Sequence, residues 1–166
     1  MFEATGNVNT HMGAIFAAAL ICYACGKLDS FNVDDVCDEV KNLSVNFSNE
    51  KHKGARKSAS DGYKTVREFS LPLYKELLKD FPKNQALSLT LLGLISINED
   101  TNILRRSNNQ VLSQAQAESK SVLDTVRLTK DFDAVRDLDN WFIENNISPG
   151  GSADLLALTE LFYCFK

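Results

Sequence analysis

Residues 145–158, NNISPGGSADLLAL, change from a polar, glycine-rich turn into an uninterrupted apolar run. Ser148 is typical of a helix N-cap, and Pro149 suits the first helical position, where its missing N–H is not needed. Gly150 and Gly151 allow close approach to the backbone, and the N–H groups and dipole of a helix start favour an anion such as phosphate. The segment therefore predicts either a phosphate-binding helix start or a well-capped helix after a tight turn.

Three predicted helices are apolar enough to be surrounded by other helices: residues 9–25, whose middle (residues 14–21) is apolar on every face, residues 83–97 and residues 153–165. More polar helices are predicted between them, including one capped by Asn32 and one over residues 63–79 that is interrupted near Pro72. No stretch alternates as a strand would. We therefore predict an all-α fold, a single domain over residues 1–166 with about eight helices, three of them buried.

The composition is that of a soluble globular protein, with 44% hydrophobic and 24% charged residues. A net charge of -4 gives no global electrostatic reason to bind nucleic acid or an anionic membrane. The apolar run near the N-terminus has no Lys or Arg before it and is shorter than the ~20 residues that a membrane-spanning helix needs. We therefore predict a cytoplasmic protein. Cys22 and Cys25 form a lone C-x-x-C pair, and small buried thiols are the favoured interpretation of the cysteines.

Three predicted interior helices carry polar ends, at residues 7–11, 98–102 and 148–154. Asp100 follows the second helix, where a carboxylate opposes the helix dipole unless a cation lies nearby. An ion pair with Arg105 or Arg106 and a magnesium ion that carries a nucleotide are equally compatible with this spacing. If the three ends meet, they form a site with backbone donors, carboxylates and a histidine.

A basic segment, residues 51–57, separates two predicted helices. Such a charge run usually forms a solvated loop. In an acidic protein it is also the densest positive patch available to a triphosphate.

Four motifs resemble those of the triphosphoribosyl-dephospho-CoA synthase family, in the family's order and across essentially the whole chain. They are GNVNTHMGAIF at residues 6–16, GAR with GY at residues 54–63, DTN followed by Arg106 at residues 100–106, and NISPGGSADLL at residues 146–156. The resemblance implies an all-helical, magnesium-dependent enzyme that joins ATP to 3'-dephospho-CoA and releases adenine. Its product is the precursor of the prosthetic group of citrate lyase or malonate decarboxylase.

The resemblance also implies roles for single residues. Asp100 and Asp154 would act as the base or as magnesium ligands, and His11 would assist the leaving adenine or hold phosphate. The implied nucleotide- and phosphate-binding residues are Asn9, Thr10, Arg56, Asn102, Arg106, Ser148, Gly150, Gly151 and Ser152.

The sequence departs from the family pattern at Met12, where the family has a lysine, and at Ser58 and Ser60, near which it has acidic residues. The family also begins with a further N-terminal portion whose motifs have no match in this sequence. The resemblance therefore implies the C-terminal part of such an enzyme. The alternatives are a nucleotide- or CoA-binding remnant without catalysis and a half-enzyme subunit. The expected partners are the two substrates and either a second copy, as a homodimer, or a missing N-terminal chain.

Overall fold

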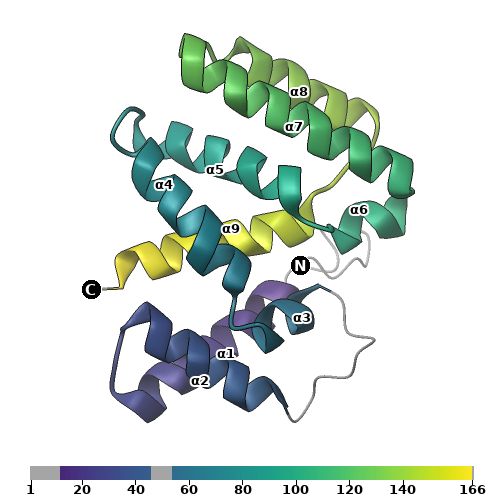
Figure 1. Cartoon of the computed structure of the whole chain (residues 1–166). Coiled ribbons are helices and arrows are strands. Elements are labelled where there is room, and N and C mark those ends of the chain that lie inside the picture. Colours follow the sequence, from purple (N-terminus) through teal and green to yellow (C-terminus); the bar gives the residue numbers. More distant parts are fainter. Residues whose placement is uncertain (1–11, 46–53, 166) are drawn as a thin grey trace, which may run out of the picture. The chain divides into compact units, whose positions relative to one another are not determined.

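The computed structural model describes residues 12–45 and 54–165, and its regular elements within these ranges are all helices (Figure 1). The described part has no strand, which confirms the all-α prediction. It contains nine α-helices and one π-helical turn, which are α1 (Met12–Leu28), α2 (Val33–Ser44), α3 (Ala55–Ser60), η3 (Val66–Ser70), α4 (Leu71–Leu77), α5 (Lys83–Ile97), α6 (Thr101–Arg106), α7 (Asn109–Thr129), α8 (Asp133–Glu144) and α9 (Gly150–Cys164).

The helices divide into two compact units. The first unit contains the chain up to Leu71 and from Ala157 onward, and the second contains Pro72–Leu156. Helix α9 therefore contributes its first turns to the second unit and its last turns to the first. No single described helix has the length and hydropathy of a membrane span, and α1 with α2 reaches them only as a pair bent by 112°.

In the second unit, α5 packs against α7, and α7 also contacts α6 and α8. As predicted, α5 is an interior helix, because it buries residues on every side, including Leu89, Thr90 and Leu94. Helix α7 buries only one face, as expected from its more polar sequence, and Asn108 caps it by accepting the N–H of Val111 at 3.0 Å.

The first unit is built from α1, α2 and α3 together with the end of α9. The predicted cap of α2 is confirmed, because Asn32 Oδ1 accepts the N–H groups of Asp34 and Asp35 at 3.0 and 3.1 Å. Tyr63 is buried, and its ring lies edge-on against Phe162 with centroids 6.2 Å apart.

Helix α1 departs from the prediction of a helix surrounded by others. It buries only Ala17, Ile21 and Ala24, whereas Met12 is 63% exposed and Ile15 is 65% exposed. A helix that is apolar on every face can be buried, but it is buried only where other elements pack against each of its faces. In the described chain α2 and α3 contact α1, and the other side of the helix remains exposed.

The predicted interruption near Pro72 takes the form of a π-helical turn, Val66–Ser70, directly before α4. Proline has no N–H for the carbonyl four residues earlier, and its ring collides with that carbonyl in a regular α-helix. A wider turn upstream relieves both problems without ending the helix.

The cysteines differ from the expectation of buried thiols. All four are free, but Cys22 and Cys164 are exposed and Cys25 is half-buried. Only Cys37 is buried, and burial raises the pKa of its thiol to about 12.

Gly62, in the turn after α3, lies close to the backbone of α2. Its φ is +67°, and a Cβ at this position would lie 3.1 Å from the carbonyl oxygen of Cys37. We expect Gly62→Ala to lower the free energy of unfolding by about 2–3 kcal/mol, through left-handed strain and a contact with rigid backbone. Urea denaturation followed by circular dichroism measures this change.

The matched control is Gly26→Ala, in α1, where a Cβ would meet no atom within 4 Å. We expect this substitution to raise the stability by about 0.5–1 kcal/mol, because alanine favours a helix over glycine. Equal effects of the two substitutions would contradict the structural role of Gly62.

Candidate functional site

The carboxylate of Asp100 lies at the start of two helices in the second unit. Its Oδ1 accepts the N–H groups of Asn102 and Ile103, at 2.9 and 3.4 Å, and so caps α6. The same atom accepts the N–H of Gly151 at 3.3 Å. Its Oδ2 accepts the N–H and the Oγ–H of Ser152, at 2.8 and 2.9 Å. Asp100 is 1% exposed, so this buried carboxylate is held by five hydrogen bonds from α6 and α9.

Local chemistry explains why Asp100 takes this position. Helix α5 ends at Ile97, and Asp is among the residues that favour the N-cap of a following helix. The prediction placed Asp100 at the end of one helix, opposed to its dipole, whereas it stands at the start of the next. The positive ends of two helix dipoles and their N–H groups balance its charge. Arg105 and Arg106 lie exposed in the last turn of α6.

Helix α9 begins one residue later than predicted. The N–H of Ala153 donates to the carbonyl of Pro149 at 2.9 Å, so Pro149 occupies the cap position that was predicted for Ser148. Asp100, from a distant part of the sequence, receives the N–H groups of Gly151 and Ser152. A carboxylate supplied by tertiary packing therefore replaces the predicted hydroxyl cap.

The two glycines at the start of α9 allow the close approach of side chains from the start of α6. A Cβ on Gly150 would lie 2.8 Å from Asn102 Nδ2, and a Cβ on Gly151 would lie 3.2 Å from both oxygens of Asp100. The sequence predicted that these glycines admit an anion to the backbone. In the structure, the anion that approaches Gly151 is the carboxylate of Asp100.

Two further side chains, Asn98 and Gln116, were not among the predicted site residues. Asn98 Nδ2 donates to Ser152 Oγ at 3.1 Å, and Gln116 Nε2, from α7, donates to the carbonyl of Asn98 at 3.0 Å. The pattern Asp-Thr-Asn after an apolar helix is itself an N-cap signal, and it marks Asp100 as a cap residue. The sequence around Gln116 carries no such signal, because Gln116 reaches Asn98 only through the packing of α7 on α5.

The remaining predicted residues have different surroundings. Asp154 is half-buried, one turn into α9, and Asn102 and Ser148 are also half-buried. Arg56 is exposed on α3, in the first unit. Asn9, Thr10 and His11 lie outside the described residues. The structure thus brings together Asp100, Asn102, Gly150, Gly151 and Ser152.

The described residues offer few ligands to a metal ion. Within residues 12–45 and 54–165 no group of three or more His, Cys, Asp or Glu side chains is placed to hold one. Both oxygens of Asp100 accept hydrogen bonds from protein donors, so this carboxylate does not fit a direct magnesium ligand in the present arrangement.

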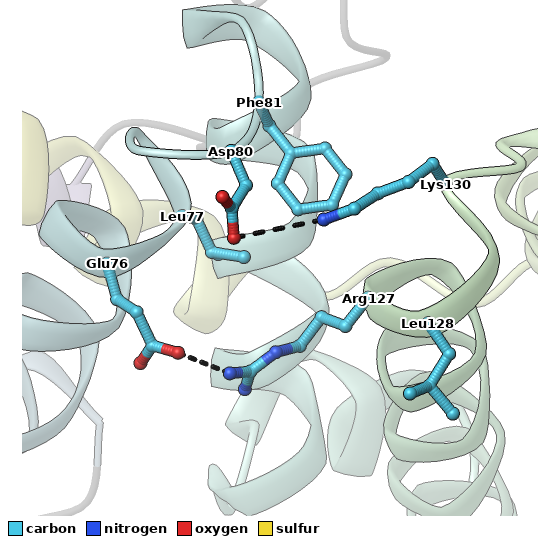
Figure 2. A pocket seen from close by; sticks show the side chains of 7 residues that line it. All are labelled: Glu76, Leu77, Asp80, Phe81, Arg127, Leu128 and Lys130. Atoms are coloured by element: carbon cyan, nitrogen blue, oxygen red, sulfur yellow. Dashed lines mark hydrogen bonds and ion pairs between the residues drawn. The ribbon is translucent and has the colours of Figure 1, made fainter.

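A depression of about 240 Å³ lies between the ends of α4 and α7 (Figure 2). Its charged groups are paired with one another: Arg127 with Glu76, and Lys130 with Asp80 at 3.8 Å. Lys130 Nζ also lies 4.0 Å from the centre of the Phe81 ring. Its two cations are thus already engaged by carboxylates, which makes this depression a poor site for a triphosphate.

Substitutions of the two glycines test which of the two close approaches contributes more to stability. We expect Gly151→Ala to lower the free energy of unfolding by about 1–3 kcal/mol, because the carboxylate that it crowds is held by five hydrogen bonds. Gly150→Ala meets only the end of the Asn102 side chain, which can turn away, so we expect little loss of stability. Urea denaturation of both variants tests this order, and a larger loss for Gly150→Ala would contradict it.

The fold and the site define an all-helical protein whose polar residues gather where helices begin. The family model described as ATP:dephospho-CoA triphosphoribosyl transferase matches residues 28–165. The chain therefore belongs to this family, which confirms the resemblance found in the sequence.

Two relatives show the extent of the similarity. The chain is 35% identical over 186 aligned residues to the probable 2-(5''-triphosphoribosyl)-3'-dephosphocoenzyme-A synthase of Salmonella gallinarum, with 96% of this chain and 62% of that protein covered. It is 34% identical over 192 residues to the 2-(5''-triphosphoribosyl)-3'-dephosphocoenzyme-A synthase of Klebsiella pneumoniae, with 99% and 64% covered. No solved structure matches the chain.

The chain thus spans less than two thirds of the length of these curated relatives. It is also shorter within the aligned region. The 186 aligned positions exceed its 166 residues by 20, so the Salmonella protein carries at least 20 residues there that this chain lacks.

Proposed function

We propose that this chain is a transferase that joins ATP to 3'-dephospho-CoA, giving 2'-(5''-triphosphoribosyl)-3'-dephospho-CoA and free adenine. Family membership over residues 28–165 supports the reaction class. The structural observation that carries the proposal is the junction at Asp100. It joins the DTN motif at the start of α6 to the glycine motif at the start of α9.

In the proposed reaction, the ribose 2'-hydroxyl of dephospho-CoA attacks C1 of the ATP ribose. The new O–C1 bond replaces the C1–N9 bond, whose electron pair leaves with adenine, while the triphosphate stays on the ribose. The hydroxyl proton goes to a protein carboxylate, and the departing adenine takes up a proton at its ring nitrogen. Positive charge develops on the ribose in the transition state, as in glycoside cleavage.

We assign the proton acceptor to Asp154 and a positioning role to Asp100. Asp100 is buried, and both its oxygens accept hydrogen bonds. Asp154 is half-buried one turn into α9, the helix whose first N–H groups Asp100 accepts. Asn102, whose backbone N–H donates to Asp100 and whose side chain lies beside Gly150, would orient the ribose.

The phosphates would be held by donors that flank this junction. We propose Gly150 and Ser148 at the start of α9 and Arg106 at the end of α6; the family resemblance adds Arg56, Asn9, Thr10 and His11. Gly151 and Ser152 would support this site by fixing the turn. Magnesium would arrive with ATP and neutralise its phosphates, because Mg²⁺ is usually held by one or two carboxylates together with phosphate oxygens.

The cellular setting follows from the substrates and is likewise a proposal. ATP and dephospho-CoA are cytoplasmic metabolites, and the product would serve the acyl-carrier prosthetic group of citrate lyase or malonate decarboxylase.

A second candidate is a chain that binds nucleotide or CoA but needs a partner for catalysis. The departures at Met12, Ser58 and Ser60 from the family pattern favour it, because they remove charges expected near a triphosphate. The partner would be a homodimer mate or a chain that carries the remaining motifs.

The test is to incubate the purified chain with ATP, magnesium and 3'-dephospho-CoA and to follow free adenine and the adduct by mass spectrometry. Adenine release that requires dephospho-CoA supports the transferase. Calorimetric titration with ATP and magnesium separates the alternatives: binding without adenine release supports the second candidate. A folded chain that neither binds nor reacts would contradict both.

A further inference from the structure

The outer face of α1 carries a continuous apolar stripe. Met12, Ile15, Ala19, Cys22 and Gly26 recur at intervals of three and four residues, and at 100° per residue they fall within an arc of about 80°. All five are exposed. The opposite side of the helix holds its three buried residues, Ala17, Ile21 and Ala24. The spacing is that of the seam of two packed helices, and within the described chain the seam is unfilled.

The side-chain sizes along the stripe are complementary to those of a second copy that runs antiparallel to it. Its large side chains, Met12 and Ile15, lie near the start of the helix, and its small ones lie near the end. An antiparallel copy centred on Ala19 places Met12 opposite Gly26 and Ile15 opposite Cys22. A Cβ on Gly26 would meet no atom within 4 Å, so there is open space for the methionine. A parallel copy would instead oppose large to large and small to small.

The charges around the stripe also suit a second copy. Residues 12–26 contain no charged side chain, so two such helices meet without repulsion. The next residue, Lys27, pairs with Glu39 of the same unit at 2.7 Å. A strongly charged partner would find no counter-charge along the seam, whereas an identical apolar helix needs none.

We propose that α1 pairs with α1 of a second copy, antiparallel and two-fold symmetric about Ala19. Tyr23, which is 58% exposed, would flank the contact. A pair of helices of this length buries on the order of 1,000 Å² in total, the lower end for specific interfaces. We therefore expect a dimer with a micromolar dissociation constant. This inference does not depend on the proposed reaction.

Analytical ultracentrifugation of the full chain tests the pairing. We expect a dimer at roughly 100 µM that dissociates on dilution. Ile15→Asp places a charge in the seam and is expected to weaken association at least about 100-fold. The control is Leu128→Asp, a substitution at an 85% exposed residue of α7, which should leave association unchanged. A monomeric wild type, or a dimer that survives Ile15→Asp, would overturn the proposal and leave the stripe to another polypeptide segment.

Cross-linking tests the orientation. In a Cys25→Ser, Cys164→Ser background, Ile15→Cys should form a disulfide-linked dimer on mild oxidation, because the antiparallel pairing brings position 15 against Cys22 of the other copy. Adding Cys22→Ser should abolish it. If the covalent dimer persists without Cys22, position 15 lies against itself and the antiparallel arrangement is wrong.

Discussion

Asp100→Ala is expected to lower the free energy of unfolding by about 3–5 kcal/mol, because it uncaps two helices and leaves buried donors without acceptors. The local cap of α6 is lost, as are three hydrogen bonds from the start of α9. Asp100 is 1% exposed, so water does not readily replace the lost oxygens. Urea denaturation followed by circular dichroism measures the loss.

Two companion variants make this result specific. Asp100→Asn keeps one acceptor oxygen but turns an N–H₂ group toward donors, so we expect a loss of about 2 kcal/mol, between wild type and alanine. Asp139→Ala removes an exposed carboxylate on α8 of the same unit and should change stability by less than about 0.5 kcal/mol. If Asp100→Ala were as stable as Asp139→Ala, the carboxylate would not hold α6 and α9 together.

Asp154→Asn is expected to reduce adenine release at least about 100-fold if the chain is active, since a neutral amide cannot accept the proton of the attacking hydroxyl. The substitution is nearly isosteric and the residue is half-buried, so we expect the fold to persist. The comparison is made at saturating ATP and dephospho-CoA, so that a loss of binding does not imitate a loss of catalysis.

The matched control is Asp137→Asn, at an exposed position on α8, which should retain wild-type release. Raising magnesium separates two roles for Asp154. A proton acceptor cannot be replaced by more metal, whereas a lost metal ligand is partly compensated by it. Recovery of activity at high magnesium would therefore contradict the assignment of Asp154 as the base.

Much of the helical framework was predictable because its signals are local. Asn32 precedes an amphipathic segment and caps it as predicted. Pro72 disturbs its helix whatever residues surround it, because proline has no N–H and its ring collides with the carbonyl four residues earlier. Helix α5 is apolar on every face and is buried as predicted.

The junction at Asp100 was only partly predictable. The sequence pointed to Gly150 and Gly151 as positions of close approach, but it could not identify the group that approaches them. The six-residue helix α6 is too short for a periodic pattern, so Asp100 was interpreted as the end of α5 and not as a cap. The burial of α1 failed as a prediction for a similar reason, because apolarity does not show which neighbours are present.

The junction also has a consequence for the order in which the chain assembles. Asp100 and Ser152 are separated by 52 residues, and a chain that emerges from the ribosome presents its N-terminal residues first. Helices α5 and α6 are complete well before the start of α9 appears. Until then, Asp100 has only the N–H groups of α6 to bind. The polar centre of the second unit therefore cannot form until the chain has been made through Ser152.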